Sequence, residues 1–196
     1  MPKILHLTAS IRGEESVSRK LSRLLVDKLT AQTSSEVIHR DLSDNSLPLV
    51  TEALFAANST QHNERSADQQ TLAKIADELI SELQQADTLV LGLPMYNFAA
   101  PATFKAWADL VARAGTTFEY TENGPRGFLN GKKVYLVVAT GGTPVGSDFD
   151  HLTPWVKFFL AFLGMTDVEV IAADGVFNDD GEEKIQQATA TIQALA

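Results

Sequence analysis

Short apolar runs and amphipathic segments alternate along this chain from one end to the other. The strand-like segments lie at residues 4–7, 37–40, 88–93, 134–139 and 168–172, and apolar side chains predominate in all of them except 37–40. Between them, apolar side chains recur at spacings of three and four, for example at Val17, Leu21 and Leu24, as on the buried face of a helix. Because strands that alternate with helices pair in parallel, the pattern predicts an α/β fold: a doubly wound, five-stranded parallel sheet with helices on both faces.

Two segments do not fit the alternation. Residues 43–66 are polar and contain Pro48, and we expect a long connection with some helix there. Residues 117–129 carry the turn sequence Glu-Asn-Gly-Pro between aromatic residues, which predicts a hairpin-like excursion from the main sheet. The sequence contains no repeat, low-complexity tract or linker, so residues 1–196 are expected to form a single domain.

The composition disfavours several kinds of partner and chemistry. A formal net charge of −9 repels phosphate backbones and anionic lipid headgroups, so we expect neither nucleic-acid nor membrane binding. The chain has no cysteine, which excludes disulfides, a thiolate nucleophile and iron–sulfur clusters. The four histidines are widely spaced, and no metal site is expected. The N-terminal residues are typical of a strand rather than a signal peptide, which favours a cytoplasmic location.

Ligands of parallel α/β sheets bind at the carboxyl ends of the strands. The loop after the first predicted strand has neither the G-x-G-x-x-G of dinucleotide sites nor the Walker sequence of nucleoside triphosphate sites. It offers instead the hydroxyls of Ser10, Ser16 and Ser18, the last two at the start of a predicted helix. Hydroxyls and free amides at a helix N-terminus bind phosphate groups. Helix capping by Ser16 or Ser18 is the alternative explanation.

The loops after the third and fourth predicted strands suit a flat ring. Residues 94–98 combine large apolar side chains with amide groups, which would stack on a ring and hydrogen-bond its edge. Residues 140–143 contain two glycines, which let the backbone approach a ligand closely. Ordinary core packing is the alternative for the first segment, and a plain turn is the alternative for the second.

Several motifs together resemble the FMN-dependent NADH-azoreductases, a branch of the flavodoxin-like quinone reductases. The motifs are Ser10, Ser-Val-Ser at 16–18, Pro-Met-Tyr-Asn-Phe at 94–98, Asp-Leu-Val-Ala-Arg-Ala-Gly at 109–115 and Tyr-Thr-Glu-Asn-Gly-Pro at 120–125. The likeness spans nearly the whole chain, and the motifs at 94–98 and 120–125 are the specific ones. The resemblance implies a flavodoxin-like fold.

The resemblance also implies one non-covalent FMN per subunit and a homodimer with active sites at the subunit interface. NADH or NADPH would reduce the flavin, and a quinone or an aromatic azo compound would then take two electrons. The residues implied to contact FMN are Ser10, Ser16, Val17 and Ser18 at the phosphate, Pro94, Met95, Tyr96, Asn97 and Phe98 along the ribityl chain and ring, and Ala139, Thr140, Gly141 and Gly142 at the ring edge. Phe118, Tyr120 and Phe162 are candidates for contact with the acceptor.

Two positions depart from the family pattern. Family members often carry Ser-Arg-Gly-Gly where this chain has Ala-Thr-Gly-Gly at 139–142, and a nearby histidine is replaced by Pro144 or Val145. The preference for NADH or NADPH and the source of the acceptor's protons therefore stay open. No residue is assigned as a catalytic acid: amides near Asn97 are candidates to support negative charge on the flavin, and His151 is the one histidine with a candidate catalytic role.

Other function classes compete with this interpretation. A flavodoxin-like electron carrier would bind FMN without turning over a small substrate; the acidic charge suits it, but residues 43–66 and 117–129 are more typical of the walls of a substrate pocket. An interaction protein with an empty site would bind no flavin. Serine hydrolase chemistry is discounted because the sequence has no G-x-S-x-G. The apolar run with Phe158, Phe159 and Phe162 favours a dimer interface.

Overall fold

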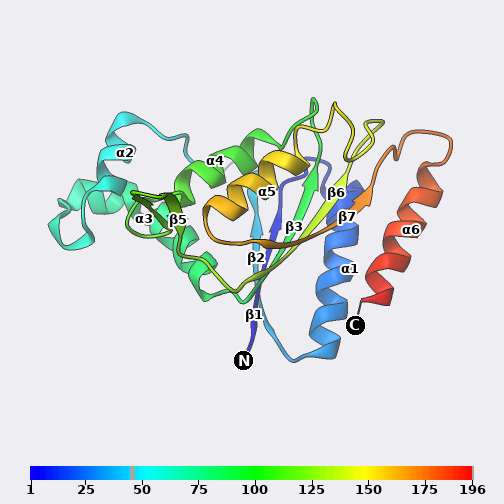
Figure 1. Cartoon of the computed structure of the whole chain (residues 1–196), viewed down its shortest axis with the longest axis horizontal. Coiled ribbons are helices and arrows are strands. Elements are labelled where there is room, and N and C mark those ends of the chain that lie inside the picture. Colours follow the sequence, from blue (N-terminus) through cyan, green and yellow to red (C-terminus); the bar gives the residue numbers. More distant parts are fainter. Residues whose placement is uncertain (45–46, 196) are drawn as a thin grey trace.

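Five parallel strands form the central sheet, in the order β2-β1-β3-β6-β7 (Figure 1). The computed structural model of the chain describes residues 1–44 and 47–195. In this part of the chain the strands of the sheet are β1 (Lys3–Thr8), β2 (Glu36–Asp41), β3 (Thr88–Pro94), β6 (Lys133–Ala139) and β7 (Asp167–Ala173). Each contains one of the five strand-like segments of the sequence, so the predicted doubly wound parallel sheet is confirmed.

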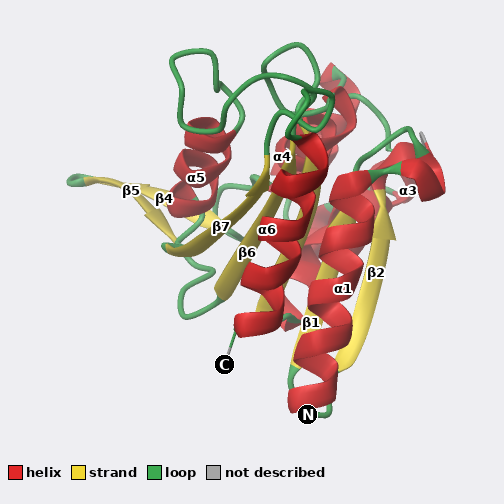
Figure 2. Ribbon diagram, turned by 90° about the vertical axis from the view of Figure 1, so that its right-hand side faces the viewer, coloured by secondary structure: helices red, strands yellow, loops and turns green. Residues whose placement is uncertain are grey.

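Helices cover both faces of this sheet (Figures 1 and 2). The α-helices of the described residues are α1 (Val17–Gln32), α2 (Glu52–Ser59), α3 (Ala67–Gln85), α4 (Ala102–Val111), α5 (Thr153–Phe162) and α6 (Gly181–Ala194). On one face, α1 and α6 pack through side chains such as Leu25 and Ile192. On the other face, α3, α4 and α5 pack through side chains such as Leu83, Trp107 and Leu160. One apolar stripe per helix therefore meets the apolar strands.

The strand order changes direction at β1. From β1 the chain moves outwards to β2, and it then crosses back to β3 on the other side of β1. The helices that follow β1 and β3 consequently lie on opposite faces, which opens a crevice at the carboxyl ends of these two strands. The parallel register places Thr8 beside Gly92 and Pro94 beside Ala139, so the loops after β1, β3 and β6 start close together.

The connection expected at residues 43–66 is partly helical, as predicted. It contains α2, which is capped by the Thr51 hydroxyl accepting a hydrogen bond from the Leu54 N–H at 3.3 Å. Asn45 and Ser46 belong to the predicted connection and lie outside the described residues. None of the helices in the described ranges is both long enough and apolar enough to cross a membrane.

The excursion predicted at residues 117–129 is an antiparallel hairpin. Its strands are β4 (Phe118–Thr121) and β5 (Gly124–Gly127). The hairpin lies against the C-terminal end of α5, where the Leu129 N–H donates to the Leu163 carbonyl at 2.9 Å. A Cβ on Gly127 would stand 2.0 Å from the Leu163 carbonyl carbon, so only glycine lets these two backbones pack this closely.

Candidate cofactor site

A cavity of about 160 Å³ opens at the carboxyl edge of the sheet. Its lining residues come from the loops after β1, β3, β6 and β7, and they are Ser10, Arg12, Ser16, Val17, Ser18, Pro94, Met95, Tyr96, Ala139, Thr140, Gly141, Val176 and Phe177. The three loops singled out in the sequence therefore meet in one place. Asn97, Phe98 and Gly142, which the sequence also indicates, adjoin the lining residues without belonging to them.

The serine turn, residues 16–18, contributes hydroxyls and amides to the cavity wall. All three of Ser10, Ser16 and Ser18 are buried. The Ser16 hydroxyl caps α1 by accepting from the Arg19 N–H at 3.2 Å, so the capping explanation holds for this residue, and its oxygen lies 3.2 Å from the Ser18 hydroxyl oxygen. The N–H groups of Val17 and Ser18 belong to the first turn of α1, where the helix itself offers them no acceptor. Such a set of donors suits a phosphate group.

Arg19 fixes the first loop without lining the cavity. Its guanidinium donates to both carboxylate oxygens of Asp41, at 2.7 and 2.9 Å, to the Thr8 hydroxyl at 3.1 Å and to the Ser10 carbonyl at 2.9 Å. Burial alone would raise the pKa of Asp41, but hydrogen bonds from Arg19 and Ser43 outweigh burial and lower this pKa to about 2. The positive charge of Arg19 is therefore paired with Asp41 at neutral pH.

Direct hydrogen bonds hold the loops after β1, β3 and β6 together. The Tyr96 hydroxyl accepts from the Ile11 N–H at 3.1 Å and lies 3.3 Å from the Ser10 hydroxyl oxygen. The Met95 N–H donates to the Ala139 carbonyl at 2.9 Å. The cavity is thus a fixed arrangement of three loops on the rigid edge of a sheet.

Asn97 and Phe98 form a tight turn beside the cavity. Tyr96 and Ala99 exchange two backbone hydrogen bonds, at 3.0 and 3.1 Å, and the residues between them have φ angles of +48° (Asn97) and +70° (Phe98). Left-handed backbone is uncommon for asparagine and strained for phenylalanine, and such strain occurs mainly at binding and active sites. Phe98 is 51% exposed, so its ring is available to a ligand at this edge.

The loop after β7 forms part of the cavity, which the sequence analysis missed. The Val176 N–H donates to the Thr140 carbonyl at 2.9 Å, and the Phe177 N–H donates to the Gly141 carbonyl at 3.0 Å. The Thr140 hydroxyl accepts from the Gly175 N–H at 3.0 Å, so it bonds within the protein. The rule that indicates the other loops applies equally to the end of β7, and this was the available signal. Arg12, a lone cation in the first loop, was also missed.

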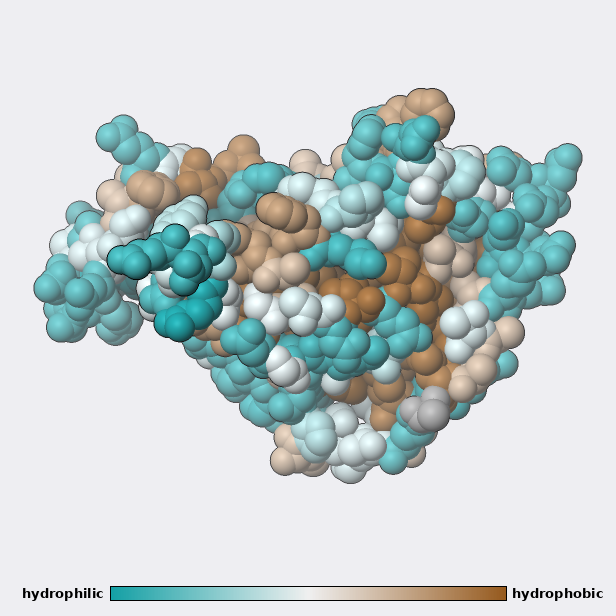
Figure 3. All heavy atoms as spheres, viewed as in Figure 1, coloured by the Kyte–Doolittle hydropathy of each residue, from teal (hydrophilic) through white to brown (hydrophobic). Residues whose placement is uncertain are grey.

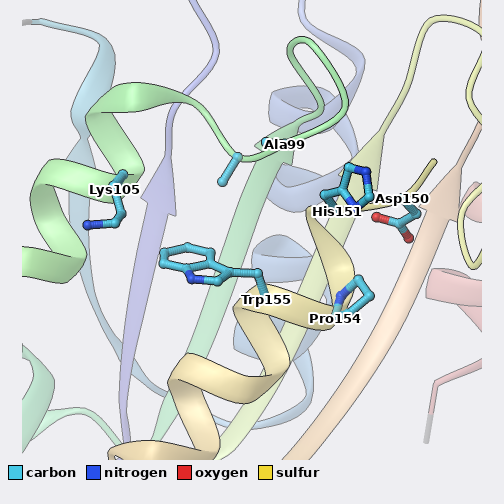
Figure 4. A pocket seen from close by; sticks show the side chains of 7 residues that line it. Ala99, Lys105, Asp150, His151, Pro154 and Trp155 are labelled. Carbon is cyan, nitrogen blue, oxygen red and sulfur yellow. The ribbon is translucent and has the colours of Figure 1, made fainter. Parts of the chain in front are cut away.

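A second cavity, of about 520 Å³, lies between the residues that follow the turn and the start of α5 (Figure 4). It is lined by Ala99, Ala100, Lys105, Asp150, His151, Pro154 and Trp155. The His151 N–H donates to the Phe98 carbonyl at 3.0 Å, which ties this cavity to the strained turn. Lys105 lies on the α4 side and Trp155 on the α5 side, a setting for a flat or anionic molecule (Figure 4).

Asp150 has a structural role at the start of α5. Its carboxylate accepts from the N–H groups of Gly146 at 2.9 Å, Leu152 at 3.1 Å and Thr153 at 2.9 Å. Burial opposes ionisation, but these backbone hydrogen bonds prevail and lower the pKa of Asp150. The carboxylate therefore stays ionised at the start of α5 and does not serve as an acid at neutral pH.

The three residues proposed to touch the acceptor form a cluster of their own. The Phe118 ring lies 4.4 Å from the Phe162 ring and 5.3 Å from the Tyr120 ring, between centroids. Phe118 is buried, whereas Tyr120 is 75% exposed. None of the three lines either cavity of the described structure. On α5, Phe159 belongs to the core and Phe158 is 72% exposed.

The chain is similar over its whole length to proteins that use FMN. A family model described as the flavodoxin-like fold matches residues 2–196. A protein of Erythrobacter litoralis named FMN-dependent NADH:quinone oxidoreductase is 60% identical over 197 residues, covering 100% of both chains.

Solved structures give the same result. An azoreductase from Bacillus anthracis strain Sterne superposes with a TM-score of 0.89 at 26% identity, covering 98% of this chain and 97% of that one. An FMN-dependent NADH-azoreductase from the Ames Ancestor strain of that organism, in complex with FMN, superposes with a TM-score of 0.87 at 25% identity, covering 98% and 96%. The chain therefore belongs to the flavodoxin-like family of FMN-dependent NADH:quinone oxidoreductases and azoreductases, as its motifs predict.

Proposed function

We propose that this protein is a cytoplasmic, homodimeric, single-domain oxidoreductase that takes electrons from NADH or NADPH and passes two of them, in a separate second step, to a quinone or an aromatic azo compound. The observation that carries the proposal is the one cavity shared by the serine turn and by segments 94–96 and 139–141. FMN as cofactor, NADH as donor and quinones as acceptors agree with the names of the relatives. Azo cleavage follows from the likeness to azoreductase structures.

The residues at this edge of the sheet fit FMN. A volume of about 160 Å³ is smaller than the ~300–1,000 Å³ of pockets that enclose a ligand, so the cavity takes the phosphate and ribityl end only. We assign the phosphate to the donors of Ser10, Ser16, Val17 and Ser18. We assign the ring to the edge of the cavity, against the lining residue Gly141 and the adjoining Phe98 and Gly142.

FMN, when bound, supplies the two-electron chemistry between nucleotide and acceptor. The chain supplies position and electrostatics. We assign to the amide groups of Asn97 and Phe98 the support of negative charge at the edge of the ring, because fixed N–H dipoles stabilise charge without reorganising. The two hydrogen bonds between Tyr96 and Ala99 hold these amides in place. Water is the proposed source of the acceptor's protons.

A second copy of the chain would complete the acceptor site. Tyr120 projects from the hairpin with 75% of its surface exposed, and Phe158 on α5 is 72% exposed. Apolar surface is also open at the sheet edge beside β7, where Val168 and Val170 are partly exposed (Figure 3). Exposed aromatic residues such as Tyr120 and Phe158 are typical of a protein interface. We propose that Tyr120 and Phe162 of one subunit face the ring held by the other.

The test is the visible absorbance of the purified protein reconstituted with FMN, followed without oxygen. Addition of NADH should bleach the flavin band, and a quinone or an azo dye should then restore it. Bound FMN that NADH leaves unbleached would favour the electron carrier, to which the net charge of −9 is suited. A protein that binds no FMN would contradict both functions.

A further inference from the structure

Arg12 is the one charged residue among the described residues that line the cavity. Its position is fixed through the backbone: the Arg12 N–H donates to the Ser10 hydroxyl at 3.3 Å, and the Arg12 carbonyl accepts from the Glu15 N–H at 3.1 Å. It lines the same cavity as Ser16 and Ser18 of the serine turn.

The guanidinium of Arg12 packs on an aromatic ring from the loop after β7. Its central carbon lies 5.3 Å from the centre of the Phe177 ring, within the range of a cation–π contact. Phe177 is itself anchored, because its N–H bonds to the Gly141 carbonyl and its ring would stand only 3.0 Å from a Cβ at Gly141. The pair thus bridges the loops after β1 and β7 at the mouth of the cavity.

The charges around the cavity leave a dianion without a counter-charge unless Arg12 provides it. Arg19 is paired with Asp41 through both carboxylate oxygens. Lys20 is directed to Glu15, 3.9 Å away, and does not line the cavity. Arg12 makes no ion pair with any residue that the structure describes. In a chain of net charge −9, the serine turn alone gives a phosphate hydrogen bonds and the partial positive charge of a helix N-terminus, but no full positive charge.

We propose that Arg12, held by Phe177, is the cationic ligand of the FMN phosphate and makes the protein select FMN over riboflavin. The inference rests on the proposed function and adds a specificity-determining residue to it. A guanidinium at the phosphate strengthens binding of the phosphorylated flavin only, because riboflavin carries no charge at that end. A mere clasp between two loops would instead favour both flavins equally, and the experiment separates these two roles.

The experiment is a fluorescence titration of the flavin-free protein with FMN and, separately, with riboflavin. For R12M we expect the affinity for FMN to fall about tenfold, equivalent to about 1.4 kcal/mol, while the affinity for riboflavin is unchanged. R12K keeps the charge and should retain most of the selectivity. K20M is the matched control, since it removes one positive charge two residues beyond the serine turn and outside the cavity. The FMN affinity of the wild type should also fall with added salt more steeply than that of R12M.

Each outcome decides between the roles. Equal loss of affinity for both flavins in R12M, or an unchanged ratio, overturns the inference while leaving the oxidoreductase intact. An R12K variant that behaves like R12M shows that stacking rather than charge matters, and it also overturns the inference. A wild-type protein that binds neither flavin overturns the proposed function as well. Arg12 is exposed, so loss of folding is not expected, and a thermal melt of each variant checks this.

Discussion

The serine turn at the start of α1 is buried and held by hydrogen bonds within the chain, whereas the β4–β5 hairpin carries an exposed aromatic side chain. Ser16 and Ser18 bond to each other and to the helix, and the loop that precedes them is fixed by Arg19. The hairpin strands are four residues long each, and Tyr120 leaves three quarters of its surface to solvent. The serine turn is buried within the chain, whereas the hairpin leaves an aromatic ring open to solvent.

This difference separates two properties that activity measurements combine. Affinity for the cofactor should depend on the buried turn and survive damage to the hairpin. The KM for the acceptor should depend on the hairpin, and it should be unchanged as long as the hairpin stays packed on α5. Variants in each region therefore test whether cofactor affinity and acceptor binding depend on separate parts of the molecule.

The largest effect is expected for Gly127→Ala, at the base of the hairpin. The new methyl carbon would lie 2.0 Å from the Leu163 carbonyl carbon and 2.1 Å from the Gly164 nitrogen. Both are backbone atoms, so relieving the clash requires a shift of the main chain. We expect the free energy of unfolding to fall by about 3 kcal/mol, measured by urea denaturation. Gly142→Ala is the control for stability, because its nearest neighbour is the Asn178 amide oxygen at 3.7 Å, an ordinary contact.

The folded fraction of the Gly127 variant tests the division itself. It should bind FMN as tightly as the wild type while its KM for quinone rises, because the hairpin lies outside the cofactor cavity. Parallel loss of FMN affinity would show that the two regions are coupled.

The second-largest effect is expected for Asp41→Asn. Asp41 pairs with Arg19, which fixes the first loop of the cofactor cavity. The substitution leaves the largely buried Arg19 guanidinium without its carboxylate partner. Because the pair is partly exposed, we expect the free energy of unfolding to fall by about 2 kcal/mol, less than for a fully buried pair. FMN binding should also weaken. Asp109→Asn breaks the exposed pair with Lys105 and should cost at most about 0.5 kcal/mol. Equal effects of the two substitutions in urea denaturation would contradict the supporting role of Asp41.

A smaller effect concerns His6 on β1, beneath the same region. Burial, followed by the charges of His39 and Arg19, lowers the pKa of His6 to about 4, and its ring bonds to the Ser22 hydroxyl at 2.9 Å. The unfolded chain binds this proton more readily, so the contribution is fully present above the ordinary pKa and is lost as the pH falls from 6.5 towards 4. Between about pH 7 and about pH 5.5 we expect a loss of about 1 kcal/mol that His6→Gln removes. An identical pH profile for both proteins would refute this assignment.

The sequence predicted the sheet and most of the cavity because both follow from local patterns. The central strands are rich in apolar residues, and the carboxyl ends of parallel strands necessarily meet at one edge. Ser10, Ser16 and Ser18 could therefore be placed together without a structure. Arg12 and Phe177 could not, because their pairing depends on hydrogen bonds between the loops after β6 and β7.

Two further features could not be predicted from the sequence. The 94–98 motif indicated a surface for a ring, but not that Asn97 and Phe98 both adopt left-handed backbone, which depends on the bonds between Tyr96 and Ala99. Phe118 and Tyr120 are two residues apart on β4, and alternation along a strand places both side chains on the same face. Phe118 is nevertheless buried, because the hairpin folds back on α5 and the Phe118 ring packs against Phe162. Its contact with the acceptor stays a prediction.

The smallest effect, and the most specific, is expected for Tyr120→Ala. The side chain is exposed, so stability should change by less than about 0.5 kcal/mol, and the affinity for FMN should not change. The KM for quinone should rise about fivefold, close to 1 kcal/mol, because an aromatic contact with the acceptor is lost. Tyr120→Phe keeps the ring and should behave as the wild type in the same steady-state assay. If Tyr120→Ala instead weakens FMN binding, the hairpin belongs to the cofactor site; if it changes neither quantity, the acceptor binds elsewhere, and the cavity beside Trp155 and His151 becomes the place to look.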